Sequence, residues 1–281
     1  RRLGVGPGDR VAAFLPNGPE AVIGMLATTS LGATWSSCSP DFGAASVVDR
    51  FGQIAPKVLI ATSGYVYAGK RIDTTATVRQ LTAQLPGLTA VIGVGKVPDT
   101  LSWEELTAAV APLEFAALPF DHPVYVLYSS GTTGPPKGIV HGAGGTLLQH
   151  LKEHLLHTDL HRDDRLFYFT TCGWMMWNWL VTGLASGATL VLYDGSPTQP
   201  DYTALWSMAD EEGITVFGTS ARYLAGLAKS GVRPRDACRL TSVRTVLSTG
   251  SPLAPETFDY VYDAVKTDVQ LSSISGGTDI V

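Results

Sequence analysis

The chain has 281 residues, of which 20 are basic and 25 acidic, so its formal net charge is -5, and 45% of its residues are hydrophobic. This composition predicts a soluble globular protein with one large core or two smaller ones. No dense basic block occurs, which argues against electrostatically driven binding of nucleic acid. The cysteines form neither a CxxC pair nor a disulfide framework, which predicts a reduced, cytoplasmic compartment. Small buried hydrophobes are expected at Cys38, Cys172 and Cys238.

The first half of the chain alternates between β-rich and helical stretches. Residues 9–16 and 57–63 predict strands, and residues 19–33, which begin with a proline, predict a helix between them. Residues 102–110 contain a capping box, because Ser102 and Glu105 can satisfy each other's exposed amides at a helix start.

A proline-rich stretch without helical period, residues 111–122, predicts a junction between two subdomains, residues 1–118 and 119–281. Beyond it the same alternation continues. The predicted fold class is therefore α/β, with two largely parallel-sheet subdomains. Strands are predicted at 124–130, 188–195, 214–220, 243–250 and 268–275, and helices at 146–156, 201–213, 221–231 and 254–265.

Residues 166–193 contain no formal charge and are long enough to span a bilayer. Asn178 and several glycines interrupt this stretch, and it ends in a β-rich run with a turn. We predict a buried strand, helix and strand here, and a membrane span is the alternative.

The loop YSSGTTGPPKGIVH, residues 128–141, has the composition of an anion-binding loop. Its glycines let backbone amides converge, its hydroxyl groups add donors, and its lysine adds a mobile positive charge. The spacing is not that of a Walker A loop, because Gly138 follows Lys137 where a hydroxyl residue is required. An exposed flexible turn would have a similar composition. The candidate phosphate ligands are Ser129, Ser130, Gly131, Thr132, Thr133, Gly134 and Lys137.

The segment YSSGTTGPPKG resembles the phosphate loop of the adenylate-forming superfamily, which includes acyl-CoA synthetases and luciferases. Two later segments resemble its next elements in the same order: residues 248–256 the element along the adenine, and residues 273–281 the element at the α-phosphate. Ser251 stands where a Glu is common, and Asp279 replaces the usual Glu that holds Mg²⁺. The resemblance assigns nucleotide contacts to Gly250, Ser251, Pro252, Ser275, Gly276, Gly277 and Thr278.

Residues 31–43 and 50–70 resemble the acetyl-CoA synthetase branch, and most closely its acetoacetate-using members. Acetyl-CoA synthetases place bulky tryptophans just before the Thr-Glu pair, whereas this chain has Gly276 and Gly277, which opens space for a longer acid. Apolar, adaptable side chains suit the opposite wall, although ordinary core packing would explain Met175, Met176 and Trp177 equally. The resemblance places Trp174 nearest the substrate. The acyl-pocket candidates are Trp174, Met175, Thr219 and Gly276.

The resemblance implies a two-step reaction. A small, acetoacetate-like carboxylic acid attacks the α-phosphorus of ATP and expels pyrophosphate, and the thiol of CoA then displaces AMP. Catalysis would rest on positioning and charge neutralisation. The implied roles are neutralisation of the β- and γ-phosphates by Lys137, orientation of the α-phosphate by Thr278 and binding of Mg²⁺ by Asp279. The family's C-terminal domain, with its catalytic lysine, has no counterpart here, so this segment alone is expected to be inactive or to bind ATP only.

Two other functions fit parts of the sequence. The stretch HLKEH matches the inverted zinc-protease pattern, with His150 and His154 as ligands and Glu153 activating water. The same stretch also suits a solvated helix face. A non-catalytic module that binds a nucleotide or an acyl group is the third possibility.

Overall fold

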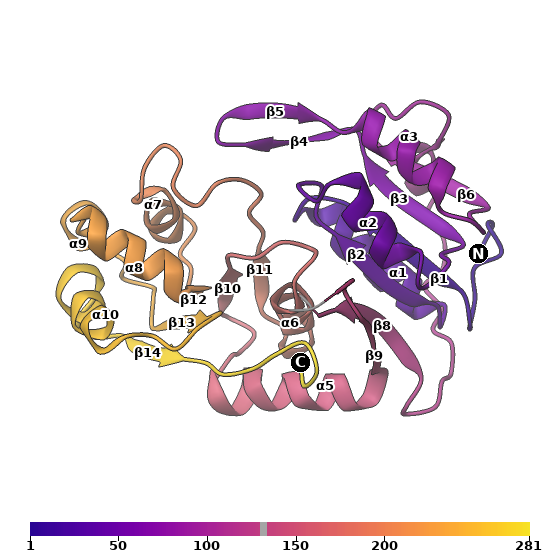
Figure 1. Ribbon diagram of the computed structural model, residues 1–281. Coiled ribbons are helices and arrows are strands. Elements are labelled where there is room, and N and C mark those ends of the chain that lie inside the picture. The colour runs from indigo at the N-terminus through magenta and orange to yellow at the C-terminus, as the bar shows by residue number, and fades with distance from the viewer. Residues whose placement is uncertain (130–133) are drawn as a thin grey trace. The chain divides into compact units, whose positions relative to one another are not determined.

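The computed structural model describes residues 1–129 and 134–281, which form two compact units (Figure 1). The predicted boundary at residues 118 and 119 differs from this division, because the two strands between residues 123 and 142 pair with the sheet of the first unit. Unit 1 comprises Arg1–Val66, Lys70–Leu148 and Thr171–Met175, and unit 2 comprises Tyr67–Gly69, Gln149–Thr170 and Met176–Val281.

Unit 1 contains a seven-stranded sheet in the order β7-β6-β3-β1-β2-β8-β9. Neighbouring strands in this sheet are parallel except β8 and β9, which are antiparallel. A separate two-stranded sheet joins β4 to β5. The strands are β1 (Arg10–Phe14), β2 (Thr34–Cys38), β3 (Val58–Thr62), β4 (Gly64–Tyr67), β5 (Lys70–Asp73), β6 (Ala90–Val94), β7 (Leu101–Ser102), β8 (Pro123–Tyr128) and β9 (Gly138–Gly142).

Helices cover this sheet because its central strands are apolar on both faces. Phe51 of α2 and Leu81 of α3 share a core with Phe14 and Leu59. On α1, Gly24 lies so close to the ring of Trp35 that a Cβ would be only 3.1 Å from it. The helices of unit 1 are α1 (Pro19–Ser30), α2 (Ala44–Phe51), α3 (Thr75–Gln84) and α4 (Trp103–Thr107), and α5 (Ala143–Leu151) begins in it.

Unit 2 contains a five-stranded sheet in the order β11-β10-β12-β13-β14, in which every pair is parallel. Parallel pairing brings the carboxyl ends of its strands to one edge, where ligands bind in open α/β sheets. The strands are β10 (Arg165–Tyr168), β11 (Thr189–Val191), β12 (Val216–Ser220), β13 (Thr245–Thr249) and β14 (Gln270–Ser273).

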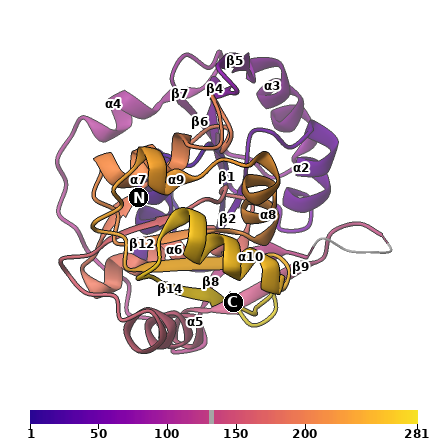
Figure 2. The same ribbon diagram turned by 90° about the vertical axis from the view of Figure 1, so that its left-hand side faces the viewer.

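This sheet packs on α7, α8 and the π-helical segment η3, which contribute Trp206, Leu224 and Val261 to a core with Phe167 and Phe217. In Figure 2, α8 and α10 stand in front of β12 and β14. The helices are α6 (Met175–Thr182), α7 (Ala204–Glu211), α8 (Ala221–Ser230), α9 (Pro234–Ala237) and α10 (Pro255–Tyr260), with π-helical segments η1 (Lys152–His157) and η3 (Val261–Val265) and a 3-10 segment η2 (Gly183–Ser186).

The uncharged stretch 166–193 forms β10, α6 and β11, as predicted. Among residues 1–129 and 134–281, no helix is long and apolar enough to cross a membrane. The three cysteines are buried, also as predicted. Ser102 caps α4 by accepting a hydrogen bond from the amide of Glu105 at 3.2 Å, and its hydroxyl also contacts Glu104 at 2.9 Å.

Candidate functional site

The phosphate-loop candidate connects β8 to β9 in unit 1. The two strands pair antiparallel with Tyr128 opposite Gly138, and the amide of Ser129 donates to the carbonyl of Lys137 at 3.1 Å. The side chain of Lys137 is exposed, as is Gly134. The loop base is therefore formed by a strand pair, and β9 is a strand that the sequence did not predict. The remaining candidates lie outside the described residues: Ser130, Gly131, Thr132 and Thr133.

The second and third segments lie side by side in unit 2, after β13 and β14. Ser248 pairs in register with Ser273, and the amide of Ile274 donates to the carbonyl of Ser248 at 2.8 Å. The amide of Leu253 donates to the hydroxyl of Ser273 at 3.1 Å, which links the two loops. Gly250 has φ 91°, a conformation that favours glycine. Exposed positions in these loops include Gly250, Ser251, Pro252, Ser275 and Gly276.

The segment after β14 ends in a turn in which the amides of Ile280 and Val281 contact the carbonyl of Gly277 at 3.2 and 3.1 Å. Within this turn Asp279 is exposed and Thr278 is partly exposed. A Cβ added at Gly277 would meet no atom within 4 Å. The backbone therefore leaves open space at this glycine.

Two hydroxyl groups at this edge of the unit 2 sheet, those of Thr219 and Ser248, are buried and have no hydrogen-bond partner among residues 1–129 and 134–281. These residues pair in register at the carboxyl ends of β12 and β13. The carbonyl of Thr219 accepts a hydrogen bond from the hydroxyl of Tyr168 at 3.1 Å. Buried polar groups are normally satisfied, so this edge has unused hydrogen-bonding capacity for a polar ligand.

The acyl-pocket candidates divide between the units. Trp174 and Met175 belong to unit 1, where the side chain of Trp174 is 53% exposed, whereas Thr219 and Gly276 belong to unit 2. Met176 and Trp177 are buried, as expected for the core alternative.

The histidines of the HLKEH stretch are buried, so the expectation of a solvated helix face is wrong for His150 and His154. The Nε2 atom of His154 donates to the carbonyl of Trp179 at 2.9 Å, and Glu153 accepts from the indole N–H of Trp179 at 2.9 Å. His150 contacts the hydroxyl of Thr182 at 3.0 Å. Burial lowers the pKa of His154 to about 4. These contacts tie η1 to α6, and no group of three potential metal ligands occurs in the described part of the chain.

Similarity to known proteins shows the family to which this α/β chain belongs. The chain matches the AMP-binding enzyme family over residues 1–278 and belongs to it. Over its whole length it is 55% identical to acetoacetyl-coenzyme A synthetase of Rhizobium meliloti (strain 1021) and covers 45% of that protein.

Two other relatives extend this finding. The chain is 44% identical to malonamoyl-CoA synthetase of Penicillium aethiopicum, of which it covers 43%. The structure of acetoacetyl-CoA synthetase from Streptomyces lividans matches 99% of this chain and 44% of that one, with a TM-score of 0.95 and 51% identity. The α/β fold class is thereby confirmed, and the chain spans less than half the length of these relatives.

Proposed function

We propose that the protein is an ATP-dependent acid–CoA ligase that converts acetoacetate, ATP and CoA to acetoacetyl-CoA, AMP and pyrophosphate. The observation that carries the proposal is the pairing of the second and third segments at the carboxyl edge of unit 2, in a chain 55% identical to an acetoacetyl-coenzyme A synthetase. This edge is where open parallel sheets bind nucleotides.

The roles of the residues follow from their chemistry. The ammonium group of Lys137 would neutralise the β- and γ-phosphates as charge moves onto pyrophosphate. The hydroxyl of Thr278 would orient the α-phosphate for in-line attack by the acid. No covalent protein intermediate is required, because positioning and charge neutralisation supply the catalysis.

The residues present fit ATP with Mg²⁺. Mg²⁺ is usually held by one or two carboxylates together with substrate phosphates, and Asp279 offers an exposed carboxylate beside the partly exposed hydroxyl of Thr278. The unsatisfied hydroxyls of Thr219 and Ser248 add hydrogen-bonding capacity at the same sheet edge. When bound, Mg²⁺ would supply charge neutralisation at the phosphates.

The relatives suggest the class of acid. Those enzymes are named for the CoA thioesters of acetoacetate and malonamate. Both acids carry a carbonyl group at the β-carbon. Both are larger than acetate, in agreement with two glycines at 276 and 277 and with open space at Gly277. We therefore favour a short acid with such a carbonyl over acetate.

Acid-dependent exchange between pyrophosphate and ATP tests the proposal. It should be measured in the longest natural polypeptide that contains this sequence, with acetoacetate, malonamate, butyrate and acetate in parallel. Exchange fastest with acetoacetate is expected. Exchange with acetate alone would support an acid–CoA ligase but reject acetoacetate as its substrate. ATP binding without exchange for any acid would favour the non-catalytic module.

A further inference from the structure

Gln53, just beyond the end of α2, uses its side-chain amide to hold the backbone on both sides of Lys137. Its Nε2 atom donates to the carbonyl of Pro136 at 2.7 Å, and its Oε1 atom accepts from the amide of Gly138 at 3.1 Å. Nε2 also donates to the carbonyl of Asp49 at 2.7 Å, one turn earlier. All these residues belong to unit 1. The amide is therefore anchored to α2 and reaches the loop 83 and 85 residues away in sequence.

Only a primary amide of this length fits these three contacts. Gln offers two N–H donors and a carbonyl acceptor on one planar group, whereas ionised Glu has no donor and Lys has no acceptor. Because Pro136 and Gly138 flank Lys137, both peptide neighbours of the lysine are fixed. The carbonyl of Lys137 itself accepts from the amide of Ser129 at 3.1 Å.

The other arm of the loop is supported from the same helix. The guanidinium of Arg50, one turn before Gln53, lies 4.9 Å from the ring centroid of Phe42 and 5.9 Å from that of Tyr128. Tyr128 is the last residue of β8, and its hydroxyl contacts that of Ser36 at 3.2 Å. Residues at and just after the end of α2 thus contact both sides of the loop: Tyr128, which ends β8 before it, and the backbone of residues 136–138 after it.

Backbone pairing of β9 with β8 also holds the stretch that leaves the loop, through Gly138 opposite Tyr128. Gly134, Lys137 and Gly138 are exposed, and within the described residues Gln53 provides the side-chain hydrogen bonds to residues 134–138. A long, flexible lysine reaches a phosphate more readily when its backbone is already fixed, because less conformational entropy is lost on binding.

We infer that Gln53 is a positioning residue for Lys137, which it holds ready to contact the terminal phosphates of ATP. The inference rests on the proposed function only for the assignment of the β- and γ-phosphates to this loop. Gln53 would act through the lysine and would itself touch neither substrate nor phosphate.

The test compares Gln53→Met, which keeps the length and removes all three hydrogen bonds, with wild type. Gln84→Met, at an exposed glutamine that ends α3 of the same unit, is the matched control. Equilibrium binding of ATP with Mg²⁺ and of AMP is measured in the longest natural polypeptide that contains this sequence. We expect about tenfold weaker ATP binding in Gln53→Met from the two lost loop contacts, AMP affinity within about twofold of wild type, and no change in the control.

AMP separates positioning from a general structural role, because it lacks the two phosphates assigned to Lys137. Equal weakening of ATP and AMP binding, or no weakening of either, would overturn the inference. Hydrogen exchange supplies a second readout, since the amide of Gly138 should exchange faster in Gln53→Met than in wild type. Unchanged exchange at that amide would also overturn it. A third outcome separates the two proposals. If Gln53→Met weakens ATP binding as expected but the wild-type protein shows no acid-dependent pyrophosphate exchange, the ligase proposal is rejected and this inference stands.

Discussion

Gly218, in the middle of β12, leaves room for the ring of its neighbour on β10. The fully buried ring of Tyr168 lies directly over the α-carbon of Gly218, where an added Cβ would overlap it. Gly218→Ala should therefore lower the free energy of unfolding by about 2 kcal/mol, because a rigid buried ring cannot move aside without strain. Denaturant titration measures the change. Gly6→Ala, at a glycine with open space, is the control and should stay within about 0.5 kcal/mol of wild type.

Gly276 is the residue at which the proposed acid specificity can be changed. An indole at this position would fill space that the proposal reserves for the acid beyond its second carbon. Gly276→Trp should reduce acetoacetate-dependent exchange at least tenfold while acetate-dependent exchange is unchanged or rises, since one or two buried carbons discriminate by about 1–3 kcal/mol. A parallel loss with both acids, in a variant that still binds ATP, would contradict the pocket assignment.

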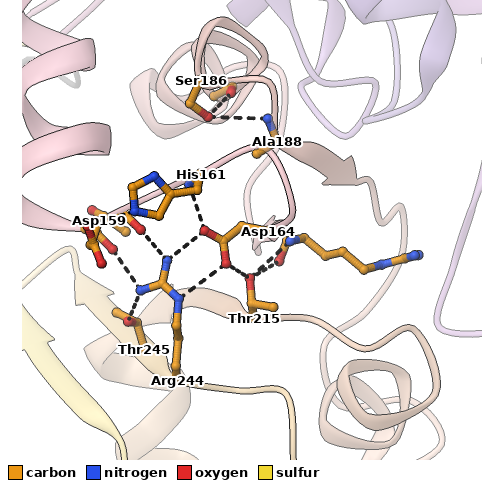
Figure 3. A network of polar contacts seen from close by, with 11 residues as sticks. Asp159, His161, Asp164, Ser186, Ala188, Thr215, Arg244 and Thr245 are labelled. Carbon is orange, nitrogen blue, oxygen red and sulfur yellow. Dashed lines mark hydrogen bonds and ion pairs between the residues drawn. The ribbon is translucent and has the colours of Figure 1, made fainter.

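At the scale of elements, one ion-pair network joins the amino ends of three neighbouring strands of unit 2 (Figure 3). Asp164, Thr215 and Arg244 each immediately precede a strand, namely β10, β12 and β13. Arg244 donates to Asp164 at 2.8 Å and to the backbone carbonyl of Thr158 at 3.0 Å. The hydroxyl of Thr215 and the amide of His161 each donate to Asp164 at 2.7 Å. Within unit 2, the network lies at the edge of the sheet opposite the loops that follow β13 and β14. It links the amino ends of the three strands to one another.

Burial alone would raise the pKa of Asp164, but its hydrogen bonds to Arg244 and Thr215 outweigh burial and lower the pKa. Because the folded pKa is depressed, this carboxylate stabilises the fold above its unfolded pKa of about 4 and stops doing so as the pH falls through the folded pKa. Asp164→Asn should cost about 2 kcal/mol at pH 7, measured by denaturant titration. Exposed Asp163→Asn is the control, and an equal loss in both variants would contradict the role of the network.

The contact between η1 and α6 predicts a second pH effect. His154 is buried beside Trp179, with Glu153 bonded to the same indole and the ring of His150 centred 6.4 Å away. Burial lowers the pKa of His154 to about 4, whereas the unfolded chain takes up this proton near pH 6.5. Its contribution to stability is therefore present above pH 6.5 and is lost progressively as the pH falls towards 4.

His154→Gln isolates this titration from the other histidines. Between pH 7 and pH 5 the wild-type protein should lose about 2 kcal/mol more of its free energy of unfolding than the variant loses. Denaturant titrations of both proteins at the two pH values measure the difference. The same pH dependence in both proteins would show that His154 is not the titrating group.

At the scale of the whole molecule, the sequence predicted the elements with a strong local pattern. Apolar runs bounded by turns became β1, β3, β12 and β13, and a proline at its first residue began α1 as expected. The division into units differs from the predicted boundary because it depends on a long-range contact: Tyr125 of β8 pairs with Trp35 of β2, 90 residues earlier. Short β9 was missed because GIVHG has no apolar alternation strong enough to separate it from the loop.

Only those parts of the candidate site that lie in continuous sequence motifs could be predicted from the sequence. Residues 248–256 and 273–281 lie together because their strands are neighbours in a parallel sheet, which the βα alternation already suggested. Gln53 gave no signal in the sequence, since a lone glutamine after a helix has no distinctive spacing and its loop contacts are more than 80 residues away. The roles of Lys137, Thr278 and Asp279 stay predictions.

Transfer of a labelled oxygen tests the central claim most directly. Acetoacetate with ¹⁸O in both carboxylate oxygens is incubated with ATP, Mg²⁺, CoA and the longest natural polypeptide that contains this sequence. Attack of the carboxylate on the α-phosphorus, followed by displacement of AMP by the thiol, leaves one ¹⁸O in each AMP formed. We therefore predict singly labelled AMP and unlabelled pyrophosphate by mass spectrometry. Unlabelled ADP in place of AMP, accompanied by labelled orthophosphate, would contradict adenylation, because the acid would then have attacked the terminal phosphate and expelled ADP.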